Sequence, residues 1–185
     1  MSDQKHKLSP ITVSLHWIVA ITIISLLAVG IYMSETHSFG LYDIHKSFGI
    51  LIFAFVLVRI VWRLRQGWPV PVSNYSKLQQ TLAKVTHWGL LLGTVIMPIS
   101  GMLYSGLSGH GFSLFGLELV AQNYHPTIEY EIVPHNDILA ELAEEIHGTI
   151  GYIMVILVVL HVVGALGHHF LDKDGTLKRM LGKSV

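Results

Sequence analysis

Four long apolar stretches constrain this chain more than any other feature of its sequence. They cover residues 11–33, 44–64, 82–104 and 138–170. A segment of about 20 apolar residues is long enough to cross a bilayer, and inside lipid a spanning segment must pair its own backbone groups, as a helix does. Only 13% of the residues are charged, against roughly 25% in soluble domains. The sequence therefore predicts an all-α integral membrane protein, a four-helix bundle in a single domain over residues 1–185.

Charged side chains are divided between the two sides of the predicted bundle. Eleven of the twelve basic residues lie on the side that holds both termini and the short middle connection: Lys5, Lys7, Arg59, Arg63, Arg65, Lys77, Lys84, Lys173, Lys178, Arg179 and Lys183. On the opposite side Lys46 is the one basic residue, and the third connection with the start of the fourth span is acidic: Glu118, Glu129, Glu131, Asp137, Glu141, Glu144 and Glu145. Lysine and arginine concentrate on the cytoplasmic side of membrane proteins, so we expect both termini in the cytoplasm.

The connections between the spans differ in kind. Residues 105–137 form a long outer connection whose glycines and alternating apolar residues predict a small cap with a short hairpin. The middle connection, residues 66–76, holds Pro69, Pro71 and Asn74 and predicts a short linker. The first span is too long for a signal peptide, and no small-residue cleavage site follows it, so we expect it to be retained.

The chain has 12 histidines and no cysteine, so histidine is its main candidate metal ligand. The lack of cysteine excludes disulfides, cysteine-ligated zinc, iron–sulfur clusters and covalently attached c-type haem. Metal chemistry inside the membrane would then rely on imidazole.

Among the histidines within or at the ends of the spans, four fall at two matched depths. His16 lies near the inner end of the first span, and His45 opens the second span near the outer side. His147 and His161 lie 14 residues apart in the fourth span. That spacing corresponds to a rise of about 21 Å and to nearly four whole turns, so both point to nearly one face. His16 therefore matches His161 in depth, and His45 matches His147.

Two imidazoles at one depth, on different helices, are suited to holding one haem iron between them. Five glycines lie close to these histidines in the sequence: Gly49, Gly148, Gly151, Gly164 and Gly167. They would leave room for a flat macrocycle, although small residues also serve helix packing in membranes. Ligation of a non-haem metal and a proton relay are the alternatives, but a relay does not require matched depths. The pattern favours two haems b.

Three further residues at the inner level are candidates for contact with the inner haem or with a quinone. Arg59 follows His45 by 14 residues, which places it where it can pair with a haem propionate or reach the cytoplasm as a snorkelling side chain. His87 opens the third span from the inside, and His168 follows His161 by two turns. Each of these two can serve a quinone site or proton uptake, or be an interfacial polar residue.

The sequence resembles the bacterial cytochrome b-561 family over nearly its whole length. The matching stretches are SLHW at residues 14–17, IHKSFG at 44–49, the run 146–161, and the tail 168–180, which reads HHFLDKD followed by TLKRM. The tail is the most specific of these stretches. The resemblance implies a multi-pass cytochrome of the bacterial inner membrane, with two haems b and a small periplasmic loop cap.

The resemblance also implies the ligands and the kind of chemistry. The family's ligands fall on His16 with His161 and on His45 with His147, the same pairs that depth indicates. Histidine on both sides leaves no open iron position, so each haem would carry electrons. A lipid quinone, ubiquinone, is the expected partner inside the bilayer, and inner histidines can supply the protons that its reduction requires.

Three functions remain open at this point. The first is an electron conduit between the quinone pool and a periplasmic donor or acceptor, where the acidic outer loops favour a basic partner. The second is a superoxide:ubiquinone oxidoreductase, an activity that the resemblance includes, although capture of an anion favours a positive mouth. The third is a cytochrome b subunit of a larger respiratory complex, for which the small cap offers little docking surface. No nucleic-acid partner is expected.

Overall fold

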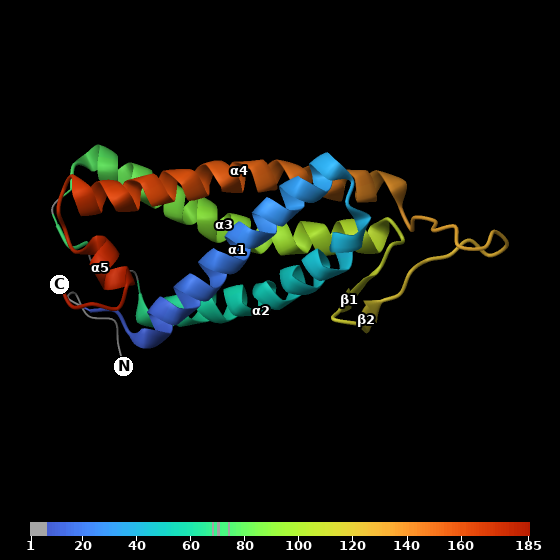
Figure 1. The fold of residues 1–185 in the computed structure, drawn as a ribbon, viewed down its shortest axis with the longest axis horizontal. Helices are drawn as coiled ribbons and strands as arrows, with labels where there is room; N and C mark the ends of the chain where they lie inside the picture. The colour runs from blue at the N-terminus through green and yellow to red at the C-terminus, as the bar shows by residue number, and fades with distance from the viewer. Residues whose placement is uncertain (1–6, 68, 70, 74) are drawn as a thin grey trace.

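The computed structural model describes residues 7–67, 69, 71–73 and 75–185; Lys5 and Asn74 lie outside them. Its long helices are α1 (Pro10–Thr36), α2 (Tyr42–Gln66), α3 (Lys77–Leu107) and α4 (Asp137–Phe170) (Figure 1). The smaller elements are η1 (Phe39–Leu41), β1 (Phe112–Leu114), β2 (Leu117–Val120) and α5 (Thr176–Met180). The described residues thus contain four helices long and apolar enough to cross a membrane. The predicted four-helix membrane bundle is confirmed.

Side-chain caps set where the helices begin. Ser9 caps α1 with its side-chain oxygen, and Pro10 stands in the first turn, where its missing N–H is not needed. Ser76 and Gln79 form a capping box at the start of α3. Because of this box, α3 begins at Lys77, ahead of the apolar stretch itself, and its polar first turns are already helical.

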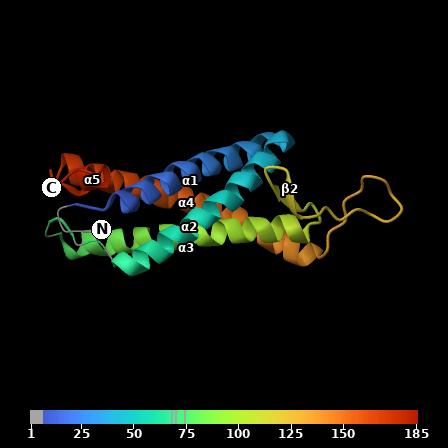
Figure 2. The ribbon, with the colours of Figure 1, turned by 90° about the horizontal axis from the view of Figure 1, so that it is seen from below.

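The helices pack as two neighbouring pairs. α3 packs extensively along α4 and α1 along α2, whereas α1 and α4 approach each other at few positions. Figures 1 and 2 show the four helices running along one long axis of the molecule. α1 begins at the end that carries α5, and the β1–β2 hairpin lies at the opposite end, with a loop that projects beyond the bundle (Figure 1).

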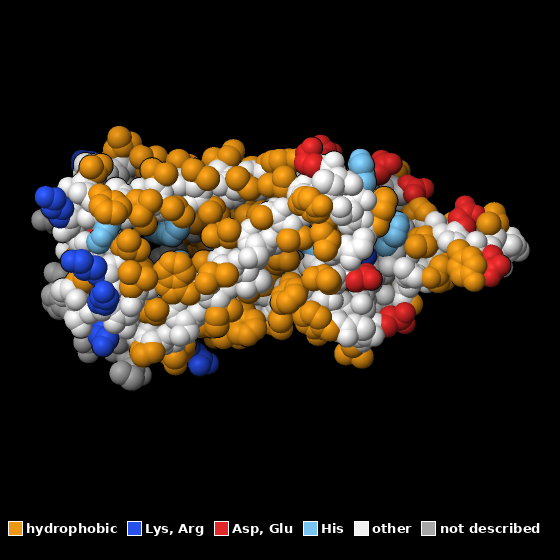
Figure 3. Space-filling view, in the orientation of Figure 1, with side chains coloured by type: hydrophobic (Ala, Val, Ile, Leu, Met, Phe, Trp, Pro, Cys, Tyr) orange, Lys and Arg blue, Asp and Glu red, His pale blue; other side chains and the backbone are white. Residues whose placement is uncertain are grey.

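The surface of the bundle is apolar along its length and charged at its two ends. Figure 3 shows lysine and arginine gathered at one end, carboxylates at the other, and hydrophobic side chains between them. Within the most apolar part of each long helix, only 6% to 28% of the residues are buried by the protein itself. Such a surface suits lipid rather than water, and the chain is a multi-pass membrane protein.

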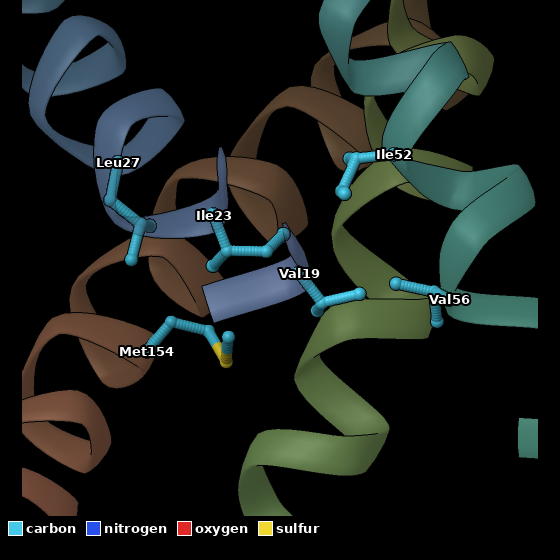
Figure 4. Close-up of a cluster of buried hydrophobic side chains, with 6 residues drawn as sticks. All are labelled: Val19, Ile23, Leu27, Ile52, Val56 and Met154. Carbon is cyan, nitrogen blue, oxygen red and sulfur yellow. The ribbon is translucent and has the colours of Figure 1, made fainter. Parts of the chain in front are cut away.

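A small apolar core lies at the middle of the bundle. Figure 4 shows its buried side chains: Val19, Ile23, Leu27, Ile52, Val56 and Met154. Met154 of α4 packs against Gly93 of α3, where an added Cβ would overlap its sulfur. Met154 stands midway along α4 between His147 and His161, so this core separates the two levels at which those histidines lie.

The outer cap is attached to the start of α2. β1 and β2 pair as an antiparallel hairpin, which confirms the short hairpin predicted for the third connection. Lys46 Nζ donates to the carbonyl of Gly111 at 3.1 Å. Ser47 Oγ donates to the carbonyl of Ser113 at 3.2 Å and accepts from the backbone N–H of Phe115 at 3.0 Å. These bonds hold the cap directly over the first turn of α2, which contains His45.

Candidate metal centres

The outer histidine pair joins α2 and α4. The ring centroids of His45 and His147 are 6.3 Å apart, with 81° between the ring planes. His147 Nδ1 lies 2.9 Å from the carbonyl oxygen of Met97 and 3.2 Å from Ser100 Oγ, both on α3. A carbonyl only accepts, so Nδ1 carries the proton and Nε2 keeps its lone pair. That tautomer is the one a metal-ligating histidine normally adopts.

Two glycines border this outer pair. A Cβ at Gly101 of α3 would come within 2.9 Å of His147 Cε1, and one at Gly30 of α1 would lie 3.4 Å from His45 Cε1. His45 Nδ1 is buried and has no hydrogen-bond partner among the described residues. An unpaired buried nitrogen is costly, and bonding to a metal is one way in which a histidine at this position gains a partner.

The inner group gathers three histidines and one arginine from four helices. The centroids of His16 (α1) and His161 (α4) are 6.2 Å apart, with 58° between the planes. His87 of α3 lies closer to His161, at 5.2 Å. Arg59 of α2 reaches within 3.1 Å of His16 Nδ1. A guanidinium only donates, so in this arrangement the nitrogen accepts and Nε2 carries the proton. A neutral histidine that binds a metal through Nε2 carries its proton on Nδ1, so with a metal bound Arg59 would lie beside the ring without donating to this nitrogen.

The spacing of the rings tests whether one metal ion fits between them. An imidazole nitrogen binds a first-row metal at about 2.0 Å and lies about 1 Å from its ring centre, so two opposed imidazoles on one metal place their centroids roughly 6 Å apart. Both predicted pairs meet this condition at 6.2 and 6.3 Å. His87 at 5.2 Å from His161 is too close to be an opposed ligand. His16 is therefore the better partner of His161.

The glycines of α2 and α4 differ from Gly89 and Gly93 of α3 in what an added Cβ would meet. An added Cβ at Gly89 or Gly93 of α3 would overlap Leu157 or Met154, which is helix packing. The five glycines near the candidate ligands behave otherwise. At Gly49, Gly148, Gly164 and Gly167 an added Cβ meets no atom within 4 Å, and at Gly151 it meets one, Met97 Cε, at 3.7 Å. Packing against a neighbouring helix does not account for these glycines, and the open space beside them is compatible with the predicted flat macrocycle.

His168 is placed apart from the inner group, in a polar cluster after α4. Its Nδ1 lies 2.8 Å from Asp172 Oδ2 and 3.5 Å from Asp174 Oδ2, and its ring centroid is 4.6 Å from that of Tyr75. The Tyr75 hydroxyl donates to Asp174 Oδ2 at 2.6 Å. Burial opposes ionisation of Asp174, but hydrogen bonds from Tyr75 and Thr176 outweigh it and lower the pKa of that carboxyl. The carboxylate thus stays charged beside His168.

Sequence reasoning missed the residues that contact these histidines. Met97 and Ser100 were hidden because a backbone carbonyl and a single serine inside a span carry no distinctive signal. Asp172 and Asp174 follow His168 in the sequence, and an acidic residue four positions after a histidine on a helix is a detectable pairing signal. Tyr75 comes from the middle connection, 93 residues before His168 in the chain, and only the fold brings it near.

Comparison with known proteins agrees with this architecture. The family model described as prokaryotic cytochrome b561 matches residues 7–183. Cytochrome b561 homolog 2 of Escherichia coli K12 is 34% identical over 179 residues, which cover 94% of this chain and 90% of the relative.

Two other relatives match over a similar length. The protein named Probable superoxide oxidase CybB from Yersinia pestis is 29% identical, covering 96% of this chain and 97% of its own. Cytochrome b561 homolog 1 of Escherichia coli K12 is 28% identical over 95% of this chain and 97% of the relative. A family model matched across residues 7–183, together with a relative 34% identical over almost the whole chain, shows that this protein belongs to the prokaryotic cytochrome b561 family.

Proposed function

We propose that the protein is a di-haem b cytochrome that carries electrons across the bacterial inner membrane, between the quinone pool and a periplasmic donor or acceptor. The observation that carries this proposal is the presence of two histidine pairs at two levels of one bundle, with ring centroids 6.2 and 6.3 Å apart. Both spacings suit one metal between opposed imidazoles. Family membership supports haem as the group that they hold.

In this proposal His16 and His161 hold the inner haem, and His45 and His147 hold the outer one. When bound, a haem with histidine on both sides supplies a reversible one-electron couple and no open position for substrate. The chain itself orients the ligands and keeps water out. The buried apolar core around Met154 lies between the two levels.

The inner end of the bundle is where we place ubiquinone. Quinone reduction needs protons as well as electrons, and the two candidate histidines lie on this side. His87 is within 5.2 Å of the His161 ring, and His168 is paired with the exposed carboxylate of Asp172. His168 can pass a proton from solvent toward the membrane boundary, with Tyr75 and Asp174 holding its ring in place. Arg59, close to His16, is available to a propionate of the inner haem.

The charge distribution supports an orientation with both termini in the cytoplasm and the hairpin cap in the periplasm. Basic side chains gather at the end where α1 begins, and carboxylates gather at the opposite end (Figure 3). This is the arrangement that the positive-inside rule describes. An acidic periplasmic end favours a basic redox partner.

A second candidate, a superoxide:ubiquinone oxidoreductase, is favoured by the relative named Probable superoxide oxidase CybB. Two observations weigh against it. The acidic outer end repels an anion. Lys46 is the one basic residue on the outer side by sequence, and its ammonium donates a hydrogen bond to the carbonyl of Gly111 in the cap. We therefore rank electron transfer with a basic protein partner first.

A stopped-flow experiment on the purified haem-loaded protein separates the two candidates. We expect a short-chain ubiquinol to reduce the oxidised protein, because the inner end contacts the quinone pool in either case. Mixing with superoxide is expected to give no haem reduction faster than spontaneous superoxide decay. Rapid reduction by superoxide followed by quinol formation would establish the enzyme instead. Failure of ubiquinol to reduce either haem would contradict the quinone link itself.

A further inference from the structure

The two histidine pairs differ in the group that contacts Nδ1 of one histidine in each pair. In the outer pair, His147 Nδ1–H donates to the Met97 carbonyl at 2.9 Å and lies 3.2 Å from Ser100 Oγ. In the inner pair, His16 Nδ1 faces the guanidinium of Arg59 at 3.1 Å. One ligand thus gives a hydrogen bond to neutral oxygens, and the other lies beside a cation.

These contacts act on a bound metal in opposite directions. A histidine that donates its second N–H to a carbonyl becomes a more basic ligand, which stabilises the oxidised metal. A fixed positive charge beside a ligand favours the reduced metal, which carries one positive charge less. Hydrogen bonds around the ligands are among the means by which proteins set haem potentials.

We infer that Ser100, with the Met97 carbonyl, holds the outer centre at a lower reduction potential than the inner centre, and that Arg59 raises the inner one. This inference rests on the proposed binding of two haems and names residues of α2 and α3 as their tuning groups. With both haems bound, this order of potentials would favour transfer of one electron from the outer level to the inner level, with no proton or bond changed.

Ser100 is placed to position His147 rather than to react. It is buried, with 4% of its surface exposed, and its hydroxyl donates to the Met97 carbonyl at 2.9 Å. The oxygen of that hydroxyl therefore turns its lone pairs toward His147 Nδ1. Gly101, the next residue, lies so close to the ring that a side chain there would push it away. The serine and the glycine together fix the ring of His147 against α3.

Redox titration of the purified haem-loaded protein, followed optically, tests this inference. The outer component is identified beforehand as the one missing from His45→Ala. We expect Ser100→Ala to raise the midpoint of the outer component and leave the inner one unchanged, because His147 loses an acceptor. We expect Arg59→Gln to lower the inner midpoint alone, and Arg59→Lys, which keeps the charge, to move it less.

The matched control is Ser105→Ala, which removes a buried hydroxyl from the same helix, one that donates to Gly111 in the cap and not to a histidine. It should leave both midpoints in place. The inference is overturned if the wild-type outer component has the higher potential, or if Ser100→Ala shifts neither midpoint or both equally. Haem content measured on the same samples keeps the two proposals apart, since a wild-type protein with fewer than two haems contradicts the proposed function instead.

Discussion

Replacing His161 by alanine should leave the purified protein with one haem per chain instead of two, and His45→Ala should do the same for the other haem. Each variant removes one of two opposed ligands, in pairs whose centroids are 6.2 and 6.3 Å apart. A single imidazole no longer holds the iron from both sides, and a haem b has no covalent link to retain it. Haem per protein, measured as the pyridine haemochrome, checks both.

The control for this prediction is His87→Ala. His87 also lies against His161, but at 5.2 Å it is too close for a metal between opposed rings, so this variant should keep both haems. If His87→Ala loses a haem while His161→Ala or His45→Ala keeps two, the ligand pairing proposed for this chain is wrong. Loss of both haems in every variant would instead indicate a folding defect, which circular dichroism of the helices would reveal.

Gly164→Leu should remove the inner haem without harming the fold. Gly164 lies one turn after His161 on α4, and an added Cβ there meets no atom within 4 Å. The open space at this position leaves room for a side chain to begin without meeting a neighbouring helix, and a leucine there would occupy the space beside the ligand that a flat macrocycle needs. We expect haem content to fall to about half of the wild-type value while helix content and thermal unfolding of the apoprotein stay the same.

The matched control for Gly164→Leu is Gly40→Leu. Gly40 also has nothing within 4 Å of an added Cβ, but it lies in η1, between α1 and α2, and touches neither histidine pair. It should keep both haems. Two haems retained in Gly164→Leu would show that this glycine serves neither packing nor cofactor, and would remove the macrocycle explanation for the glycines of α4.

The bundle could be predicted from the sequence because lipid imposes strict rules on backbone pairing and span length. The four apolar stretches and the glycine-rich third connection each point to one structural consequence, and the described residues show both. Basic and acidic side chains do lie at opposite ends of the bundle, but the cytoplasmic location of the termini stays a prediction. The residues at which the helices begin were harder to predict from the sequence. α3 begins at Lys77 because Ser76 and Gln79 cap it, and hydropathy does not register a polar turn that is already helical.

The histidine pairs were predictable for a geometric reason, since 14 residues on a helix return to one face and depth then selects a partner. The lateral neighbours were not predictable in this way. His87 shares the inner level with His161, and Met97 reaches His147 through its backbone; both contacts come from the packing of α3 on α4. His168 forms a cluster with Asp172 and Tyr75 rather than with the inner pair, because the chain turns after α4.

The most direct test of two bis-histidine haems is low-temperature electron paramagnetic resonance of the oxidised wild-type protein. Opposed imidazoles leave no open position on the iron, so the account predicts two low-spin ferric signals of equal intensity, one absent from His161→Ala and the other from His45→Ala. A single low-spin signal per chain, or a high-spin signal from an iron with an open position, would contradict it.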